Sequence, residues 1–506
     1  MVSPRSSPTS SSSPPPMAPP AMHPAAPDPR RRRALQACDF CHLRGLRCRR
    51  DPGRGESSQR ATCSSCRDYN VECKMTRVVR KRGRKPAAKN LGPGDRVHGK
   101  LLDESDDERG FRSLRAVRRL VQVYRTTMYQ CYFPFLSEMD LLKRWEHSIP
   151  EPHQPSYMLL MALCAVSAQS IALKAVFNED VEDDAPDVDS NLYFDEAVCR
   201  IPGVISQPQD LDYLRSFGLM ALYSLKQGHH GNFHRYLGLY HGLVAQIGFH
   251  DEARWPDDIS ITEVDDRRRF FWCVYRLEVH GASVLGHMVR LPESQVSVRY
   301  PRITPAMAPE TRAWTAGWDY ITDLFRILEY AVSSLRRVKD RRPALAGLSD
   351  GLPPTTLVDS LGRLKTNKPR ILLGIDERGG CGDLQSNRCR YMSVQITCAE
   401  ALVTIMTLLY CQAPAQEVMD VADKFIQEVA RAPLIMFKVA SSQIVYDLLG
   451  VGHMLYNASR HDGNQYRTEA RRLIAFLADL VGNLELDIPL AAEVGERLRR
   501  LADSAS

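Results

Sequence analysis

Several signatures of common protein classes are missing from this 506-residue sequence. It contains no P-loop, no G-x-S-x-G nucleophile motif and no G-x-G-x-x-G dinucleotide motif, so no common catalytic signature supports an enzyme. Residues 1–29 are rich in proline and serine and lack the apolar region of a secretory signal. We therefore expect a reducing compartment, in which the fourteen cysteines do not form a disulfide framework.

Long apolar runs and alternating strand patterns are also missing. The longest apolar run, residues 158–173, is interrupted by Ser167, Gln169 and Ser170 and falls short of the roughly 20 residues of a membrane span. We interpret it as a buried helix and expect no membrane partner. From about residue 111 onward, apolar side chains instead recur with a period near 3.6. This periodicity predicts a large all-α domain.

The predicted helices are bounded by proline, glycine, aspartate and asparagine. An apolar stripe over residues 114–124 predicts the first helix of the domain, whereas residues 178–189 and 347–384 are predicted as loops. The other predicted helices cover residues 157–177, 210–226, 231–248, 265–287, 314–339, 390–411, 416–431, 433–457, 464–483 and 487–503.

Cysteine is concentrated in one short window. Two triplets share the spacing C-x2-C-x6-C, and the second repeats the first 25 positions later. Clustered thiolates are zinc ligands, and two tetrahedral ions need eight ligand positions, which six cysteines fill only if two of them bridge. A four-cysteine ribbon would leave ligands over, and a metallothionein would carry cysteine throughout. The predicted metal ligands are Cys38, Cys41, Cys48, Cys63, Cys66 and Cys73.

Positive charge is concentrated on the same segment. The whole chain has a formal net charge of +7. Residues 30–89 contain 19 lysines and arginines against 5 acidic residues, whereas residues 90–506 carry a net charge of −7. A focused positive field suits a polyanion, and nucleic acid is the first candidate.

The cysteine pattern resembles that of the fungal Zn(2)-Cys(6) binuclear zinc cluster transcription factors and matches all six ligands. In that family the first and fourth cysteines bridge two zinc ions, which implies that Cys38 and Cys63 do so here. The family docks a short helix, residues 42–47 here, in the DNA major groove over a GC-rich triplet. The resemblance implies two zinc ions per chain, double-stranded DNA as partner, and the nucleus as location.

The same resemblance implies particular DNA contacts. Arg44 occupies a basic base-reading position, and an arginine can pair with guanine O6 and N7. The family usually has a second basic residue next to it, where this chain has Gly45. Arg47, Arg49 and Arg50 are predicted to contact phosphates, which position the module without reading sequence.

A basic linker follows the cysteines. Residues 80–85 predict a nuclear localisation signal. Their R-G-R core also looks like an AT-hook for the minor groove, and a solvated linker that adds phosphate contacts remains open as well. No heptads are sustained over three repeats after the linker, so a homodimer is left open. The predicted localisation residues are Arg80, Lys81, Arg82, Arg84 and Lys85.

Two parts of the helical body resemble the fungal-specific transcription factor domain, also called the middle homology region. One is residues 133–136 (FPFL), and the other is made of residues 235–256 and 263–296. The second part contains QIGFH at 246–250, DDRRRFFW at 265–272 and GHMVRLP at 286–292. In the family this region is all-helical, is tied to regulation of the activator, and is not catalytic.

Other clusters in the body have simpler interpretations. Residues 265–266 are acidic but precede arginines, not the further carboxylates of a Mg²⁺ site, so they predict a charged helix start. His230 and His234 lie four apart without the glutamate of H-E-x-x-H. The aromatic triplet 270–272 fits core packing better than a small-molecule pocket. Free core thiols are expected at Cys131, Cys164, Cys199, Cys273, Cys381, Cys389, Cys398 and Cys411.

The sequence thus predicts a small Zn2Cys6 binuclear cluster module and a large all-α domain, with a disordered N-terminus and a basic linker. The boundaries are 1–33 for the tail, 34–75 for the module, 76–110 for the linker and 111–506 for the regulatory domain. The predicted protein is not an enzyme. It is a nuclear, sequence-specific transcription factor for RNA polymerase II genes, with DNA and the transcription machinery as partners.

Activation of a metabolic or secondary-metabolite pathway is the commoner role in the family. Repression, or a small-molecule-sensing scaffold with secondary DNA contact, stays open. The sequence does not choose the target genes, the DNA site, the half-site spacing, the oligomeric state or an effector for the helical domain.

Overall fold

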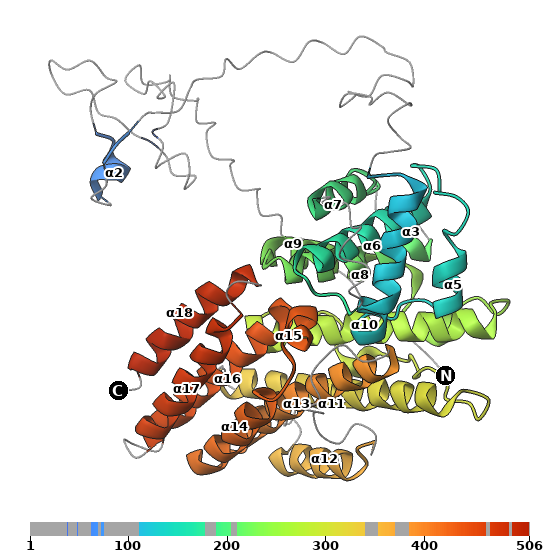
Figure 1. Ribbon diagram of the computed structural model, residues 1–506. Helices are drawn as coiled ribbons and strands as arrows, with labels where there is room; N and C mark the ends of the chain where they lie inside the picture. The colour runs from blue at the N-terminus through green and yellow to red at the C-terminus, as the bar shows by residue number, and fades with distance from the viewer. Residues whose placement is uncertain are drawn as a thin grey trace, which may run out of the picture. The chain divides into compact units, whose positions relative to one another are not determined.

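The computed structural model describes residues 38, 48, 62–68, 72–74, 111–177, 189–203, 210–339, 353–369, 384–461, 466–484 and 488–504. The chain divides into two compact units, residues 1–100 and 101–506, and each is described by itself (Figure 1). The described part of the first unit contains one short helix, α2 (Ser64–Asp68). The predicted tail 1–33 and linker 76–110 lie outside the described residues.

The described part of the second unit is helical, as predicted. Its extended segments meet in one isolated parallel bridge, between Asp251 and Ser297. The short turns are η3 (Glu252–Arg254) and η4 (Glu293–Gln295). The helices are α3 (Leu114–Thr126), α4 (Met128–Cys131), α5 (Glu138–Lys143), α6 (Pro155–Ala172), α7 (Ser190–Cys199), α8 (Leu211–Lys226), α9 (His230–Ile247), α10 (Ile261–Leu285), α11 (Pro309–Lys339), α12 (Pro354–Thr366), α13 (Leu384–Tyr410), α14 (Ala415–Val429), α15 (Leu434–Ala440), α16 (Ser442–His461), α17 (Arg467–Gly482) and α18 (Pro489–Ser504).

Helices α3 to α11 enclose the first hydrophobic core, with α6 inside it. Helix α6 is apolar on every side and packs against α3, α7 and α8. By length and composition alone, α6 and residues 386–410 of α13 are apolar enough to cross a membrane. However, 78% and 67% of their apolar windows are buried inside the protein, which agrees with the prediction of a buried helix at 158–173.

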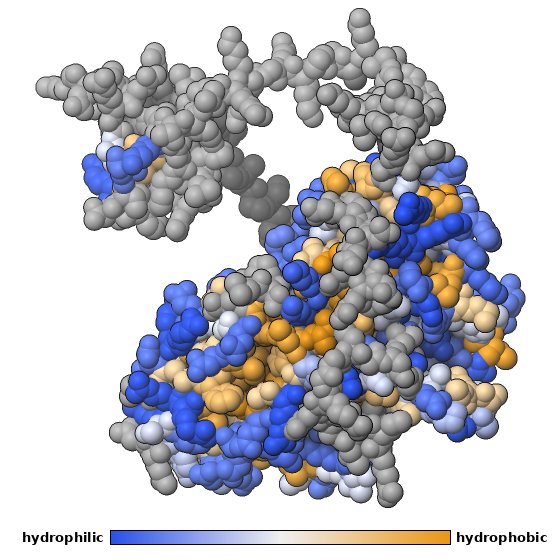
Figure 2. Space-filling view, viewed as in Figure 1, coloured by the Kyte–Doolittle hydropathy of each residue, from blue (hydrophilic) through white to orange (hydrophobic). Residues whose placement is uncertain are grey.

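Helices α13 to α18 form a second core, the orange and red bundle of Figure 1. Helix α13 contributes side chains to both cores, and α10 and α11 reach the second bundle by packing against α16 and α13. Figure 2 shows that hydrophilic side chains alternate with apolar patches on the viewed face of the body. The two cores meet where α10 packs against α16 and α11 packs against α13.

Helices α9 and α10 each end at a glycine that lies in one of the stretches resembling the family. Gly248 ends α9 with φ of 68°, and Gly286 ends α10 with φ of 75°. Both angles are left-handed, a region that glycine enters without steric cost. Helix α10 begins with Ser260, whose Oγ accepts a hydrogen bond from the backbone N–H of Glu263 at 3.1 Å. The QIGFH and GHMVRLP stretches are therefore helix ends.

The structure differs from the predicted helices in several places. Helices α4, α5 and α7 lie outside the predicted helices, and α12 lies inside the stretch 347–384 that was predicted as loop. Helix α12 buries fully only Leu357 and Leu361, so its periodic signal is weak. The single helix predicted over 433–457 is broken at Ser441, with a bend of 96° between α15 and α16.

The break at Ser441 has a tertiary cause. Ser441 has φ of 52°, although no proline or glycine marks the position. The next residue, Ser442, donates a hydrogen bond from Oγ to the carbonyl of Lys226 at 2.6 Å. Lys226 is the last residue of α8, so this contact joins the start of α16 to a helix of the other core.

Candidate metal centre

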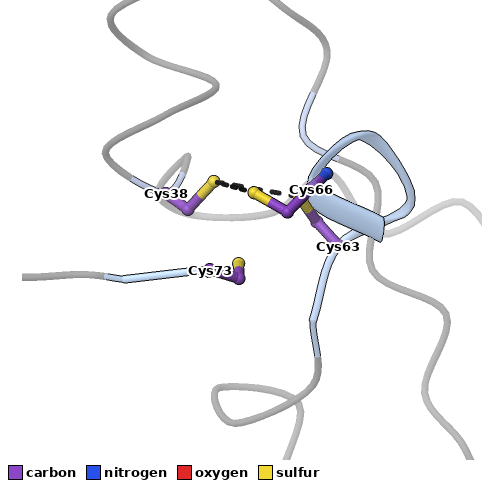
Figure 3. Close-up of side chains that lie close together, drawn as sticks. All are labelled: Cys38, Cys63, Cys66 and Cys73. Atoms are coloured by element: carbon purple, nitrogen blue, oxygen red, sulfur yellow. Dashed lines mark hydrogen bonds between the residues drawn. The ribbon is translucent and has the colours of Figure 1, made fainter. Parts of the chain in front are cut away.

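Four of the six predicted metal ligands converge on one point. The sulfurs of Cys38, Cys63, Cys66 and Cys73 all lie within 4.8 Å of one another (Figure 3). The Cys38 sulfur is 3.8 Å from that of Cys63 and 3.5 Å from that of Cys66. Zinc–sulfur bonds of about 2.3 Å in a tetrahedron place sulfurs about 3.8 Å apart. The spacing therefore fits one tetrahedral zinc ion.

Helix α2 brings the second C-x2-C pair together. Cys63 directly precedes the helix and Cys66 lies in its first turn, so one helical turn places both sulfurs on the same side. The backbone N–H of Arg67 donates to the Cys63 carbonyl at 3.1 Å. The N–H of Cys66 donates to the Cys63 sulfur at 3.4 Å, a contact that stabilises a thiolate.

The two triplets meet at Cys38 and Cys63. Cys48, the last cysteine of the first triplet, is half-buried, and burial together with the Cys63 and Cys38 side chains raises the pKa of its thiol. Cys38 and Cys63 therefore lie next to sulfurs of both triplets. A bridging cysteine needs that position, because it must contribute to two metal ions at once.

The chemistry of these donors favours a soft divalent cation. Burial, with the Cys38 and Cys63 sulfurs beside it, raises the pKa of the Cys66 thiol far above its usual range. Without a cation such thiols stay neutral, whereas zinc binding displaces their protons. The described buried core of the first unit consists of cysteines alone. A core of this kind gains its folding free energy from metal binding.

The remaining predicted site residues of the first unit lie outside the described residues and stay predictions. They are Cys41, Arg44, Arg47, Arg49, Arg50, Arg80, Lys81, Arg82, Arg84 and Lys85.

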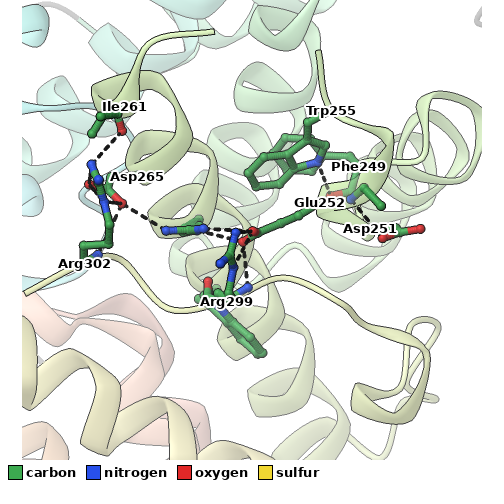
Figure 4. A network of polar contacts seen from close by, with 11 residues as sticks. Phe249, Asp251, Glu252, Trp255, Ile261, Asp265, Arg299 and Arg302 are labelled. Atoms are coloured by element: carbon green, nitrogen blue, oxygen red, sulfur yellow. Dashed lines mark hydrogen bonds and ion pairs between the residues drawn. The ribbon is translucent and has the colours of Figure 1, made fainter. Parts of the chain in front are cut away.

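In the helical body, the acidic pair at the start of the DDRRRFFW stretch forms ion pairs. Asp265 accepts from Arg302 Nη2 at 3.0 Å and from Arg268 Nη1 at 3.4 Å (Figure 4). Asp266 accepts from the backbone N–H of Ser137 at 2.9 Å and from Arg269 Nη1 at 2.6 Å. Both carboxylates therefore have protein partners, which agrees with the interpretation of this pair as a charged helix start and not as a Mg²⁺ site.

Arg268 extends this network to η3. It makes two hydrogen bonds to Glu252, of 2.7 and 2.8 Å, and the backbone N–H of Arg299 donates to the same carboxylate at 2.8 Å (Figure 4). Burial alone would raise the pKa of Glu252, but the hydrogen bonds from Arg268 and Arg299 outweigh it and lower the pKa to about 2. The network joins α10 to the segments on either side of it.

The two stretches that carry the family resemblance contact each other. Phe133 packs edge-on against Phe270 with ring centroids 6.2 Å apart. A Cβ on Gly218 of α8 would lie 2.9 Å from Phe270 and 3.3 Å from Phe133, so this glycine allows the helices to approach closely. Phe270 and Phe271 are core residues at 1% exposure, whereas Trp272 also lines a cavity. Core packing is thus the main role of the aromatic triplet.

The histidines also serve packing. His241 Nε2 lies 2.9 Å from a Glu278 oxygen, His234 Nδ1 lies 2.8 Å from Arg290, and His230 contacts the Tyr446 hydroxyl. Among the described residues, the cysteine cluster alone groups three or more histidine, cysteine or acidic side chains suitably for a metal ion.

Of the eight cysteines outside the cluster that were expected in the core, four are buried. Cys199 is exposed on α7. Cys389 and Cys411 are intermediate, and Cys381 lies outside the described residues. The buried ones are Cys131, Cys164, Cys273 and Cys398.

Sequence reasoning missed two buried charges at the junction of the two cores. Arg276 on α10 is 8% exposed, and Asp447 on α16 is 4% exposed and lies 2.8 Å from His280 Nε2. In the sequence, each of the two charged residues looks like an ordinary solvent-facing residue of its helix. No local signal separates them from surface residues, because only the packing of α10 against α16 buries them.

One family model matches part of the helical body. Residues 121–312 match the fungal specific transcription factor domain. "Pyrimidine pathway regulatory protein 1" of Saccharomyces cerevisiae (strain ATCC 204508 / S288c) is 29% identical over 111 residues, which are 22% of this chain and 12% of that protein. No solved structure matches the chain. The domain match and the yeast regulator together support a fungal transcription factor.

Proposed function

We propose that this chain is a zinc-dependent, sequence-specific DNA-binding transcription factor. The observation that supports the proposal is the convergence of Cys38, Cys63, Cys66 and Cys73, which would be the ligands of one zinc ion in a cluster bridged by Cys38 and Cys63. Cys38, Cys41, Cys48 and Cys63 would hold the second zinc ion. Both ions are structural, since six thiolates leave no open coordination position for a substrate.

DNA is the partner that suits the charge on the module. The excess of positive charge lies between residues 30 and 89, around the cysteines. In the proposed complex Arg44 reads a guanine of a GC-rich triplet, and Arg47, Arg49 and Arg50 hold phosphates. Residues 80–85 act in nuclear import and add salt-dependent affinity.

The helical body is the proposed regulatory part. Residues 121–312 match a domain of fungal transcription factors, and the yeast relative is by name a regulator of the pyrimidine pathway. We therefore infer that this chain activates RNA polymerase II genes of a metabolic pathway. The described contacts of the body are packing contacts and ion pairs, which suits regulation better than catalysis.

Selection of bound DNA from a random pool tests the proposal. The full-length chain, loaded with zinc, is expected to enrich a short GC-rich triplet, as one copy or as two at a fixed spacing, and the spacing reports dimer geometry. The same chain after treatment with a strong zinc chelator is expected to enrich nothing. Enrichment that survives zinc removal, or no enrichment with zinc bound, would contradict the proposal.

A further inference from the structure

Ser441, between α15 and α16, has a backbone conformation that serine rarely adopts. Its φ is 52° and its ψ is −133°. This combination lies outside the left-handed helical region and is costly for any residue that has a Cβ. Ser441 is fully buried, and its Oγ has no hydrogen-bond partner. The other described non-glycine residues with positive φ, Lys174 and Gln412, are exposed. Ser441 is therefore strained inside the domain.

The local sequence favours a continuous helix at this place. No proline or glycine occurs from Leu434 to Leu449, and the apolar periodicity predicts one helix over residues 433–457. The backbone N–H of Ser441 donates to the carbonyl of Phe437 at 2.7 Å, which is the hydrogen bond of an α-helix. The helix thus reaches Ser441 and is broken there by the conformation of one residue.

Contacts with the first core fix the start of α16. Ser442 Oγ donates to the carbonyl at the end of α8 at 2.6 Å, and Tyr446 contacts the first residue of α9. Asp447 lies 2.8 Å from Nε2 of His280 on α10. Residues four and five apart lie on the same side of a helix, so one side of α16 is held by three helices of the first core.

Helix α15, in contrast, belongs to the second core. Its seven residues include Met436, Phe437 and Val439, which are buried in that core. The helix packs against α13 and α16. The two helices are therefore held by different cores, and Ser441 is the residue between them.

We propose that Ser441 is a strained hinge and that Ser442 is the latch that keeps it bent. When the contact between Ser442 and the carbonyl of Lys226 is lost, α15 leaves the second core and continues α16 as one helix. The strain at Ser441 and the helical preference of the sequence favour this extended state, and the latch opposes it. The apolar side of α15 would then be uncovered. The proposal concerns the helical body alone and does not depend on the proposed function.

A first experiment measures the strain. In the full-length chain, Ser441→Gly and Ser441→Ala both remove the unpaired hydroxyl, but only glycine adopts the observed angles without cost. We expect the unfolding temperature of Ser441→Gly to exceed that of Ser441→Ala by about 2 °C.

Ser393 is the matched control, because it is a buried serine inside α13. At an ordinary helical position alanine is more favourable than glycine, so Ser393→Ala should unfold at a higher temperature than Ser393→Gly. If alanine is also the better residue at position 441, the hinge stores no strain and the proposal is wrong.

A second experiment measures the bend. Nitroxide labels on noncanonical amino acids replace Leu434 and Asn457, which are both exposed, and pulsed electron paramagnetic resonance gives the distance between them. At 1.5 Å per residue, a bend of 96° places the two backbone positions about 25 Å apart, whereas one continuous helix places them about 35 Å apart. The unaltered hinge and Ser393→Ala should give the short distance, and Ser442→Ala should give the long one.

A double variant connects the strain to the bend. Adding Ser441→Gly to Ser442→Ala should return most molecules to the short distance, because glycine removes the strain and disfavours the continuous helix. Helical circular dichroism shows whether each variant is folded. A short distance in Ser442→Ala, a long distance with the hinge unaltered, or an unchanged long distance in the double variant would each overturn the proposal.

Discussion

The cysteine module and the helical body solve the problem of a stable interior in different ways. In the module, the described buried side chains are cysteines gathered around one point. In the body, two cores are built from many apolar side chains of sixteen helices and the segments between them. With zinc bound as proposed, the module would depend on a few coordinate bonds, whereas the body distributes its stability over many small contributions.

This difference decides how each region responds to damage. Loss of one ligand removes a large share of the module's folding free energy. Loss of one contact in the body costs a few kcal/mol and leaves the other contacts of its two cores in place. A variant that unfolds the body as completely as a ligand variant unfolds the module would break the comparison.

The largest effect is expected for Cys66→Ser. This change removes a ligand from the four-sulfur cluster, so specific DNA affinity should fall by at least about 100-fold and bound zinc should decrease. DNA binding by fluorescence anisotropy and metal content per chain measure both effects. The helical circular dichroism and unfolding temperature of the body should not change.

Cys199→Ser is the matched control, because Cys199 is exposed on α7. It should retain wild-type zinc content and DNA affinity. Equal losses in Cys66→Ser and Cys199→Ser would contradict the metal assignment.

Glu252→Gln tests the ion-pair network of the body. Arg268 and Arg299 hold the pKa of Glu252 at about 2, below the ordinary 4.5, so the carboxylate stabilises the fold above pH 4.5 and loses this contribution as the pH falls toward 2. The variant should lose about 3 kcal/mol of unfolding free energy at pH 7 and less at pH 3.

Chemical denaturation at both pH values measures this loss. Glu417→Gln, at an exposed position on α14, is the control and should change stability by less than about 0.5 kcal/mol. If Glu252→Gln loses the same unfolding free energy at pH 7 and pH 3, the negative charge of Glu252 is not the source of the stabilisation.

Arg44→Ala tests base reading against phosphate binding. Losing a guanine contact should weaken the binding free energy for the preferred DNA by about 1–3 kcal/mol and should change binding to random DNA little. Lys81→Ala is the comparison variant. It should weaken binding to both DNAs alike, and it should reduce the salt dependence of binding by the amount that corresponds to about one phosphate contact. Titrations with both DNAs at two salt concentrations measure these affinities. If Arg44→Ala loses the same affinity for both DNAs, Arg44 does not read a base.

The smallest effect is expected at a helix end of the body. Gly248→Ala places a Cβ at φ of 68°, 2.5 Å from Arg254 Cδ, and should cost about 1–2 kcal/mol. Gly242→Ala lies in the same helix with open space around the added Cβ and should stabilise by about 0.5–1 kcal/mol. Thermal unfolding of the two variants should therefore shift in opposite directions, and shifts of the same sign would contradict this view of the helix end.

The predicted helices were right where apolar periodicity was strong. Helices α8, α9 and α14 begin and end within two residues of their predicted bounds. Helix α12 was missed because it buries fully only two leucines, and the break at Ser441 was missed because its cause is a contact with the carbonyl of Lys226. Periodicity reports a buried face, but it does not report which other helix that face will meet.

The sequence by itself determined the all-α class of this protein and predicted a thiol cluster that could hold a metal ion. Spacing decides both, because two cysteines three apart meet across one helical turn and apolar residues at a period of 3.6 share one helix face. Only the tertiary structure decided that Asp266 accepts a hydrogen bond from Ser137, that His280 lies against Asp447, and that Arg276 is buried. These contacts join residues far apart in the chain, so they depend on how the segments pack and leave no local pattern.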